Sequence, residues 1–374
     1  MKAPFCIVSS SRADYNFLHS IVHSFKETEL ESSFTILISE DELNKHSRIE
    51  ETTSDGLTPD CIIPYPNPSS ESEVGQTIAH IVKSMGDLFE EKRPKALIIF
   101  GDRIEILVTA FIAFVLNIDV IHIAGGEVSL GSKDDKYRKM ISVLAKLHFP
   151  ISKSGAEQLL NSGVNSESLF YIGDPSQDNI KALIETAPEE LAKTYLKYGI
   201  KPGDSFVIFT FHPTSMKSDY GFAELTELLE ALHVFLKEKA FRLIITGRNA
   251  DFAPECFDEL LEQFRLKNQE QVIYTPNLGR RDYIFLLSMA RLMVGNSSSA
   301  FYEASYLGVP SLSIGDRQLG RSHSDSVKFI PAQKIMIEEA VREALDTYPH
   351  RTRTKLVGGV GEKIVKKIIE TYGD

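Results

Sequence analysis

The chain contains few of the residues that mark secreted, zinc-binding or membrane-spanning proteins. Its 374 residues include three cysteines, Cys6, Cys61 and Cys256, which lie far apart and form no Cys-x-x-Cys pair. Such spacing argues against a disulfide framework or a zinc site and fits a reducing cytosol. No apolar run reaches the length of a membrane span, and the N-terminal residues lack the apolar core of a signal peptide. The sequence therefore predicts a cytoplasmic protein that has no membrane partner.

Positive charge is also scarce. The chain has 41 Lys and Arg against 52 Asp and Glu, which gives a formal net charge of -11. Proteins that bind nucleic acid broadly carry a basic surface, so nucleic acid is excluded as a partner. Any bound anion must instead be held by a local site. The hydrophobic share of 43% is that of an ordinary globular protein, and the length favours two domains.

Short apolar runs alternate with longer amphipathic stretches along the whole chain. Continuous apolar runs of this length are typical of strands that are buried on both faces, and their alternation with helices predicts parallel, doubly wound α/β sheets. Two series of such runs predict two domains of this kind. The predicted strands cover residues 5–8, 34–38, 96–100 and 120–123, then 206–210, 243–246, 272–274 and 292–294; the clearest helices cover 72–91, 104–116, 222–237 and 282–290.

We place the domain boundary where the first series ends. Residues 1–176 form the predicted first domain, and residues 177–357 form the second, which restarts at the Lys-Pro-Gly-Asp turn 201–204. A lone helix within residues 358–374 follows with no further strand. Residues 40–56 are polar and poorly patterned, which predicts a mobile loop or an irregular helix.

The most informative motif is Gly-Asn-Ser-Ser-Ser at residues 295–299. It follows an apolar run and leads into a predicted helix, whose N-terminus offers unpaired N–H groups and the positive end of its dipole to an anion. Ser297, Ser298 and Ser299 add hydroxyl donors. Glu303 comes about one turn later, within reach of a sugar hydroxyl beside a bound phosphate. The alternative is an ordinary Ser-capped helix.

Other unusual residues of the first half also stand at predicted strand ends, where α/β sheets bind ligands. Ser9 to Ser11 precede Arg12 in a turn that suits a phosphate, unless it is only a capped helix start with a solvated Arg. Asp102 follows the strand 96–100 and is either a helix N-cap or a carboxylate in a cleft.

Further acids follow the strand 120–123. Glu127 comes directly after Gly125 and Gly126, which permit close approach of a ligand, and Asp134 and Asp135 stand before a helix whose dipole they complement. Several carboxylates at one edge of a sheet favour acid/base chemistry.

The second half contributes basic and amide groups. His212 follows the strand 206–210 beside a proline and titrates near neutral pH, as an acid/base residue must. Asn277 stands in a turn that suits the edge of a base, although a plain turn is the alternative. Arg317 and Arg321 stand near the serine motif and suit phosphate, unless they are only solvated.

As a set, these strings resemble the hydrolysing UDP-N-acetylglucosamine 2-epimerases of the sialic acid pathway. The resemblance implies two Rossmann-like domains with a central cleft, as in GT-B glycosyltransferases, and a C-terminal helix that crosses back to the first domain. It also implies a homodimer or homotetramer. The matching strings are Ser11–Tyr15, Gly101–Glu105, Gly125–Glu127, Asp134-Asp135 with Arg138, His148-Phe149, His212-Pro213, Asn277–Gly279, Gly295–Ser299 with Glu303-Ala304, and Ile314–Gln318 with Gly320-Arg321.

The implied reaction converts UDP-N-acetylglucosamine and water to N-acetylmannosamine and UDP through a glycal. The acid/base set would be Asp102, Glu127, His212 and either Asp134 or Asp135, of which Asp134 is preferred. No metal and no cofactor are expected. The resemblance implies that UDP is held by Arg12, Ser297, Ser298, Ser299 and Glu303. To these we add Asn277 in its turn and Arg321 near the serine motif, which completes the predicted UDP-binding set.

Three departures from the family's pattern leave the sugar open. Lys139 stands where members commonly have His, Ala124 where they often have His or Glu, and Ala300 where Gly is usual. A UDP-linked 2,4-diacetamido-trideoxy sugar, from the legionaminic acid pathway, is therefore an alternative substrate. A non-hydrolysing epimerase, a GT-B glycosyltransferase and an inactive nucleotide-sugar-binding protein are further alternatives. The usual strings of the non-hydrolysing enzymes, Glu-Ala-Gly-Leu-Arg and Arg-Arg-Glu-Asn, are absent.

Overall fold

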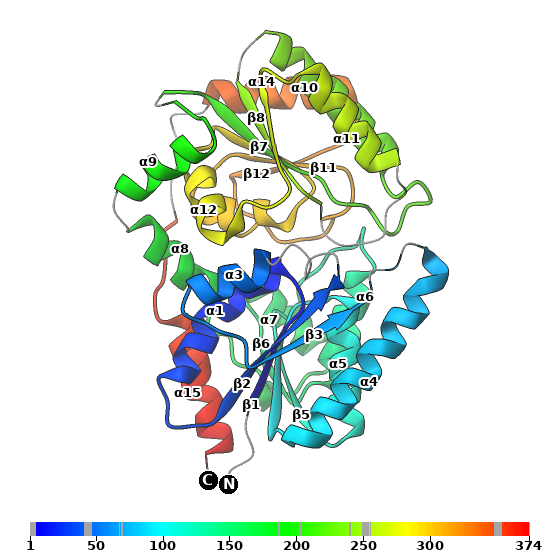
Figure 1. Ribbon diagram of the computed structural model, residues 1–374, viewed down its shortest axis with the longest axis vertical. Coiled ribbons are helices and arrows are strands. Elements are labelled where there is room, and N and C mark those ends of the chain that lie inside the picture. The colour runs from blue at the N-terminus through cyan, green and yellow to red at the C-terminus, as the bar shows by residue number, and fades with distance from the viewer. Residues whose placement is uncertain are drawn as a thin grey trace. The chain divides into compact units, whose positions relative to one another are not determined.

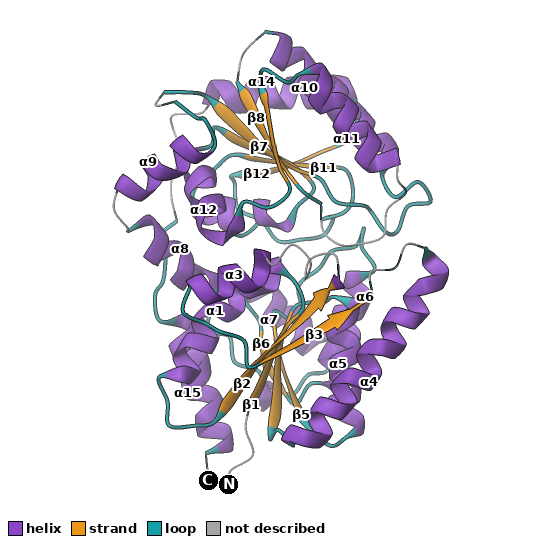
Figure 2. Ribbon diagram, viewed as in Figure 1, coloured by secondary structure: helices purple, strands orange, loops and turns teal. Residues whose placement is uncertain are grey.

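Buried apolar strands build two separate parallel sheets, and each sheet has its own core. The computed structural model describes residues 5–40, 47–66, 68, 70–185, 188–201, 203–238, 241–248, 254, 256–347 and 354–373. The chain divides into two units, of which unit 1 comprises residues 1–127, 134–179 and 357–374, and unit 2 comprises residues 128–133 and 180–356. The predicted fold class, two doubly wound α/β domains, is confirmed (Figures 1 and 2).

Unit 1 contains a six-stranded parallel sheet in the order β3-β2-β1-β4-β5-β6. β1 and β4 lie at its centre and are almost wholly buried, which is why their sequences are apolar except for Ser9 at the end of β1. The strands are β1 (Phe5–Ser9), β2 (Ser32–Ser39), β3 (Cys61–Tyr65), β4 (Ala96–Phe100), β5 (Asp119–Ile123) and β6 (Leu147–Phe149).

Helices cover both faces of this sheet. α4, α5 and α6 form the layer on one face, and α1 lies with the C-terminal helix α15 on the other (Figure 1). The Tyr372 hydroxyl at the end of α15 donates to Asp119 Oδ2 at 3.1 Å, which ties the last helix to the start of β5. The helices are α1 (Arg12–Lys26), α3 (Ser47–Ser54), α4 (Val74–Lys92), α5 (Ile104–Val115), α6 (Asp134–Leu144), α7 (Lys153–Asn161) and α15 (Val360–Tyr372), and α8 (Ser176–Ile184) leads out of the unit.

Unit 2 repeats the same topology. Its six parallel strands lie in the order β12-β11-β10-β7-β8-β9, so β7 and β10 occupy the central places that β1 and β4 occupy in unit 1. The strands are β7 (Phe206–Thr210), β8 (Arg242–Thr246), β9 (Val272–Thr275), β10 (Leu292–Gly295), β11 (Ser311–Ile314) and β12 (Val327–Ile330). The helices are α9 (Pro188–Lys197), α10 (Phe222–Lys237), α11 (Cys256–Lys267), α12 (Gly279–Met289), α13 (Glu303–Tyr306) and α14 (Lys334–Thr347).

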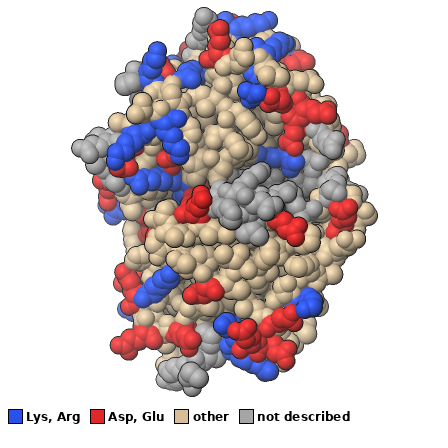
Figure 3. All heavy atoms as spheres, viewed as in Figure 1, with Lys and Arg blue, Asp and Glu red and all other residues tan. Residues whose placement is uncertain are grey.

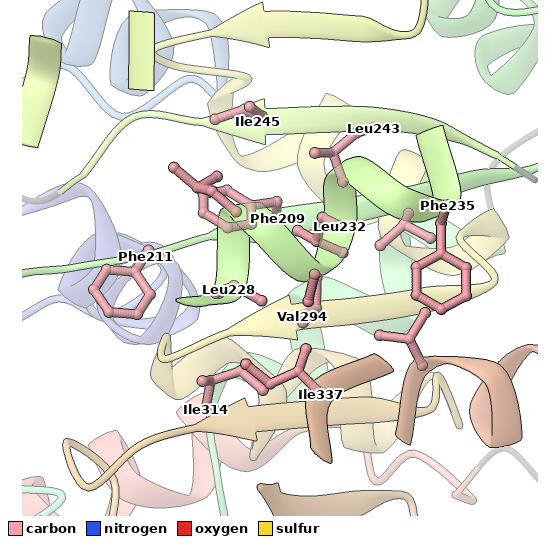
Figure 4. Packing of buried hydrophobic residues seen from close by; sticks show 14 of the residues in the cluster. Phe209, Phe211, Leu228, Leu232, Phe235, Leu243, Ile245, Val294, Ile314 and Ile337 are labelled. Carbon is pink, nitrogen blue, oxygen red and sulfur yellow. The ribbon is translucent and has the colours of Figure 1, made fainter. Parts of the chain in front are cut away.

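The core of unit 2 lies between its sheet and the helices α10, α11 and α14. Leu228 and Leu232 of α10 lie among Phe209, Leu243 and Val294 of three neighbouring strands (Figure 4). Helix α10 is long and rich in leucine, so it can bury one whole face against the strands. This packing fixes the central strands and therefore the loops that leave them.

The structure differs from the sequence-based expectations in a few segments. Within the polar region 40–56, residues 47–54 form the regular helix α3, while residues 41–46 lie outside the described residues. Strands β3, β6, β11 and β12 were not among the predicted apolar runs. β11 has the sequence Ser-Leu-Ser-Ile, and its two serines hide a strand that is nevertheless fully buried.

Candidate active site

The strand order places a topological switch point at the centre of each sheet. In such sheets the chain leaves the two central strands in opposite directions, and ligands bind outside their carboxyl ends. In unit 1 these ends are followed by Ser9–Ser11 and Gly101-Asp102, and in unit 2 by His212 and the serine motif. Most predicted site residues therefore lie at or beside the two switch points.

Arg138 organises the carboxylates of unit 1. Its side chain, on α6, is only 2% exposed, and its guanidinium donates to Asp102 Oδ2 and to the carbonyl oxygen of Glu127 at 2.5 Å. It also lies 3.7 Å from Asp135. The predicted N-cap role of Asp102 is wrong, because the cap position of α5 belongs to Arg103 and has no side-chain hydrogen bond. Asp102 instead belongs to a charged network.

Glu127 is buried and faces the start of α7. Its Oε1 accepts a hydrogen bond from Ser152, the N-cap of that helix. The glycines before it serve packing inside unit 1, since a Cβ on Gly126, at φ +82°, would lie 2.1 Å from the Gly155 carbonyl oxygen. Packing inside unit 1 is thus enough to explain the two glycines, and their predicted role in the close approach of a ligand is not required.

The two neighbouring acids of α6 have different surroundings. Asp135 is buried and pairs with Lys139 at 2.7 Å as well as with Arg138. Asp134 is half-buried at the first position of the helix. Lys139, which replaces the family's usual His, is therefore engaged with a neighbouring carboxylate. Asp134 remains the preferred acid of the pair.

His122 joins the Asp102 loop to α6. One ring nitrogen, Nε2, lies 2.8 Å from the Gly101 carbonyl oxygen, and Nδ1 lies 3.0 Å from Ser142 Oγ. Burial lowers the pKa of His122 to about 3, and burial also lowers the pKa of His148, on the adjacent strand, to about 4. His122 is thus a neutral structural link at pH 7, which the sequence did not single out.

The two buried rings make stability fall as the pH falls. The unfolded chain protonates His122 near pH 6.5 while the folded protein keeps it neutral, so unfolding takes up protons. This histidine alone removes about 1.4 kcal/mol of stability per pH unit below 6.5. We expect urea unfolding to show a smaller loss between pH 7 and pH 5 in His122→Gln than in the unaltered protein, by about 2 kcal/mol. An identical pH dependence in the two proteins would contradict this prediction.

The end of β1 is occupied by the protein's own carboxylate. Asp14 is buried and accepts from the Ser9 hydroxyl at 2.5 Å and from the Ser10 and Ser11 amides at 2.7 and 3.1 Å. Ser11 in turn caps α1. The alternative of a capped helix start is therefore right for these serines. Arg12 begins α1, but its side chain lies outside the described residues, so its UDP contact stays a prediction.

The serine motif of unit 2 leads into shorter helical elements than the prediction of a helix with a strong dipole requires. Residues Ser298–Ala300 form a single 3-10 turn, and α13 (Glu303–Tyr306) is only four residues long. A strong helix dipole is therefore absent here, and individual side chains must supply the binding energy. Ser297 and Ser299 are buried, and Ser299 Oγ lies 2.6 Å from the Tyr283 hydroxyl. Burial, followed by the charge of nearby Glu303, raises the pKa of Tyr283.

Arg321 brings a buried guanidinium to the motif. It is 7% exposed, and one terminal nitrogen donates to the Tyr302 hydroxyl at 2.7 Å. Within the described residues its Nε has no hydrogen-bond partner. Asn277 lies in the turn before α12, where its Oδ1 accepts from the Gly279 amide at 2.9 Å. This is the plain turn of the alternative interpretation, and its contact with a base stays a prediction.

His212 is the half-buried residue in an otherwise buried loop, Phe211–Thr214. Its backbone N–H donates to Asn296 Oδ1 at 2.7 Å, and its carbonyl oxygen accepts from Asn296 Nδ2 at 2.8 Å. The first residue after Gly295 thus contacts the predicted acid/base histidine. The sequence had shown Asn296 only as part of the serine motif.

A six-residue strap, Val128–Lys133, belongs to unit 2 although it lies in the sequence between Glu127 and Asp134 of unit 1. Its Leu130 amide donates to the Leu319 carbonyl at 2.9 Å, and its Lys133 amide donates to Ser215 Oγ at 3.1 Å. The strap therefore lies beside the loop that carries Arg317, and it contacts Ser215, which follows His212 closely in the sequence.

Other kinds of site find little support in the described residues. No group of three or more His, Cys, Asp or Glu residues in this part of the chain could hold a metal ion. No helix among the described residues is long and apolar enough to cross a membrane. On the face shown in Figure 3, basic side chains form separate groups with acidic ones beside them rather than one broad basic field.

Comparison with known proteins assigns the chain to a family. A family model described as UDP-N-acetylglucosamine 2-epimerase matches residues 46–369. The chain belongs to this family. The broader part of the prediction is therefore confirmed, and the protein is an enzyme of the UDP-N-acetylglucosamine 2-epimerase family; its place in the sialic acid pathway stays a prediction.

Similar relatives act in more than one pathway. The chain is 28% identical over 342 residues to the GDP/UDP-N,N'-diacetylbacillosamine 2-epimerase (hydrolyzing) of Campylobacter jejuni, covering 87% of this chain and 84% of the relative. It is also 28% identical over 342 residues to the polysialic acid biosynthesis protein P7 of Escherichia coli, covering 91% and 85%. The crystal structure of UDP-GlcNAc 2-epimerase from Neisseria meningitidis bound to UDP-GlcNAc has the same fold, with a TM-score of 0.83 at 15% identity over 99% of this chain and 100% of that one.

Proposed function

We propose that the protein is a hydrolysing 2-epimerase that converts UDP-N-acetylglucosamine and water to N-acetylmannosamine and UDP, for the biosynthesis of sialic acid-type sugars. The observation that carries this proposal is the buried Nε of Arg321, which has no hydrogen-bond partner within the described residues; its guanidinium contacts Phe301 and Tyr302, which directly follow the serine motif with its buried Ser297 and Ser299. A buried guanidinium N–H without a partner is costly, and a phosphate oxygen would satisfy it. The proposed diphosphate site therefore lies at the end of β10.

UDP is the leaving group of the proposed reaction. Its diphosphate gains negative charge as the bond from C1 to oxygen breaks, so positive and hydrogen-donating groups there stabilise the transition state. Glu303 would accept from the ribose, and the Asn277 turn would face the base. The proposed UDP ligands are Arg12, Asn277, Ser297, Ser298, Ser299, Glu303 and Arg321.

Acid/base residues perform the chemistry on the sugar. A base takes the proton from C2, UDP leaves from C1 on the opposite face, and a glycal with a C1–C2 double bond forms. Water then adds its oxygen to C1, and a proton returns to C2 from the other face, which inverts that centre. We assign these proton transfers to Asp102, Glu127, Asp134 and His212, because carboxylate and imidazole side chains are the usual general acids and bases.

A second sugar is favoured by two observations. The Campylobacter jejuni relative and a 26% identical one from Legionella pneumophila are both named as diacetylbacillosamine 2-epimerases. Ala124, at the position where the resemblance leads us to expect His or Glu, is small, buried and held at φ +65°. We infer that a small residue at this position would favour a sugar with a second acetamido group. UDP-N,N'-diacetylbacillosamine is therefore the alternative substrate.

Proton NMR in deuterated water tests the reaction and the sugar together. Each UDP-sugar is incubated separately with the protein, and kcat/KM is compared. Free N-acetylmannosamine that carries deuterium at C2, together with UDP, supports the leading proposal, and the corresponding free diacetamido sugar supports the alternative. A UDP-linked product would indicate a non-hydrolysing epimerase. The absence of turnover without an acceptor would favour a glycosyltransferase or an inactive binding protein.

We also propose that two copies of the chain associate through α5 and α6. α5 has one charged residue, the buried Glu105, yet its outer face exposes Phe111, Phe114 and Val115. Helices that are apolar all round are normally buried. Val143 of α6 is 84% exposed at the same level, because both helices start at the same edge of the sheet and run in the same direction.

The size of this apolar face fits a second copy. With Leu116 and Met140 it exposes on the order of 500 Å² of apolar surface, which is near the upper limit for monomers and much of the roughly 800 Å² that each partner contributes to a standard interface. The neighbouring helix α4, in the same layer, exposes Gln76, His80, Lys83 and Asp87 instead. On α6 the apolar face is bordered by the exposed Lys136 and Lys139, of which Lys139 is paired with Asp135.

Sedimentation measures the proposed association. We expect the unaltered protein to be a dimer or tetramer at micromolar concentration and the double variant Phe114→Glu/Val143→Glu to be smaller by at least a factor of two. The matched control, Lys83→Glu on α4, should leave the mass unchanged. A monomeric unaltered protein, or a double variant of unchanged mass, would contradict this interface.

A further inference from the structure

Asn296 holds the backbone of His212 at two points. Its Oδ1 accepts from the His212 amide at 2.7 Å and its Nδ2 donates to the His212 carbonyl oxygen at 2.8 Å. A primary amide has one acceptor and one donor group side by side, so it can bind the N–H and the C=O of a single residue at once. This contact lies just beyond the parallel pairing of β7 with β10, whose last partners are Thr210 and Gly295.

Asn296 is itself firmly fixed. It is fully buried, its amide donates to the Thr210 carbonyl at 3.1 Å, and its carbonyl accepts from Gln318 Nε2 at 3.0 Å. The preceding Gly295 has φ +140°, and a Cβ there would lie 1.9 Å from the Thr210 carbonyl oxygen. Only glycine allows the backbone to approach closely enough for Asn296 to reach the His212 loop.

The loop is anchored on its other side as well. Arg317 Nε donates to the Pro213 carbonyl oxygen at 3.2 Å, and Thr214 is bonded through its amide to the Tyr220 carbonyl at 2.7 Å. The backbone is therefore held on either side of His212, while the His212 side chain stays half-exposed. A fixed backbone beneath an accessible side chain is what acid/base chemistry requires, because small displacements of a proton-transfer group are costly.

We propose that Asn296 is a positioning residue that sets the place of the His212 imidazole through this two-point contact with its backbone. The inference rests on the proposed function, in which His212 touches the sugar. Among the side chains of this size, asparagine has both a donor and an acceptor with the required spacing. Alanine lacks both, and an ionised aspartate lacks the donor and would face the His212 carbonyl with a second acceptor.

A double-variant cycle tests whether Asn296 acts through His212. We expect Asn296→Ala to lower kcat about 100-fold with little change in KM or in UDP affinity. The loss in the His212→Ala/Asn296→Ala double variant should not exceed the loss in His212→Ala alone, since the residue being positioned is gone. Losses that multiply, or an unchanged kcat in Asn296→Ala, would overturn the proposal.

The variant Asn296→Asp should recover activity at low pH, and a variant that is only less stable would not show this recovery. The groups bonded to Asn296 are neutral, namely the backbone of His212 and Thr210 and the side-chain amide of Gln318. Burial raises the pKa of a carboxyl group, and a protonated aspartate can again donate and accept. The activity of Asn296→Asp relative to unaltered protein should rise as the pH falls, whereas that of Asn296→Ala should stay flat. A flat ratio in both would count against the two-point contact.

Unit 2 contains a matched control. Asn268 is also buried and contacts a histidine, His233 Nδ1, at 2.7 Å through its Oδ1, while its Nδ2 donates to the Phe264 carbonyl at 2.8 Å. It lies after α11, and His233 lies on α10, outside the proposed active site. Asn268→Ala should destabilise the protein to a similar degree and leave kcat unchanged.

Hydrogen exchange separates this inference from the proposed reaction. The His212 amide should exchange at least tenfold faster in Asn296→Ala than in unaltered protein or in Asn268→Ala, whatever the substrate proves to be. If no UDP-sugar is turned over, the proposed function fails while faster exchange still supports the backbone contact. Unchanged exchange at His212 would overturn the positioning role even in an active enzyme.

Discussion

Replacement of Asp102 by Asn should lower kcat by about 10³-fold and change the affinity for UDP by no more than about threefold. General acid/base groups contribute roughly 10² to 10⁴ in rate, and the asparagine keeps the shape of the side chain while it loses the proton-transfer group. The contact with Arg138 persists through the remaining amide oxygen, so the network of unit 1 stays in place. Release of UDP measures turnover, and calorimetry measures UDP binding.

The neighbouring residue Glu105 provides the control for this prediction. It is a buried carboxylate in the first turn of α5, paired with Arg103 at 3.1 Å and bonded to the Tyr65 hydroxyl at 3.3 Å. Glu105→Gln should affect stability more than kcat. His212→Ala should behave like Asp102→Asn. A large loss of UDP affinity in Asp102→Asn would contradict the placement of Asp102 at the sugar rather than at the diphosphate.

Replacement of Arg138 by Met should both destabilise the protein and abolish turnover. The substitution keeps most of the volume but takes the buried guanidinium away from buried Asp135 and removes the donor to Asp102 and to the Glu127 carbonyl. Loss of one partner from a buried charge network costs about 3–5 kcal/mol. Urea unfolding should register this loss, and turnover should fall by at least the factor expected for Asp102→Asn.

A second substitution separates the two effects of Arg138. In the double variant Arg138→Met/Asp135→Asn the buried carboxylate that lost its arginine partner is replaced by a neutral amide, so we expect most of the lost stability to return while turnover stays low. Recovered turnover in that variant would mean that Arg138 acts on stability alone. Arg138→Lys should not rescue activity, because an ammonium group cannot bind three acceptors with the planar geometry of a guanidinium.

The central strands could be predicted because burial dictates their composition. β4 and β7 agree with the predicted ranges residue for residue, since strands covered on both faces must be apolar throughout. The same rule fails for β11, where two serines are buried between neighbouring strands, and for β6, whose three residues are too few to form a pattern. Short strands gain their stability from their neighbours, which a local pattern does not show.

The candidate site could be predicted only in part for a similar reason. Strand ends and residue chemistry pointed to Asp102, His212 and the serine motif. Local sequence could not show that Arg138 contacts Asp102, because the two are 36 positions apart, nor that Asn296 binds a backbone 84 positions away. It also made Asp102 look like a helix cap. Such contacts depend on the order of strands in the sheet.

The strap Val128–Lys133 limits how the chain can be divided into separately expressed fragments. A cut between residues 179 and 180 yields a C-terminal fragment without the strap, so Leu319 loses its backbone partner and Ser215 its amide donor. The N-terminal fragment likewise lacks α15, whose residues come after unit 2 in the sequence. Neither unit is a single continuous piece of chain. Expression of one half by itself, or its transfer into a chimaera, therefore requires a redesigned connection rather than a simple truncation.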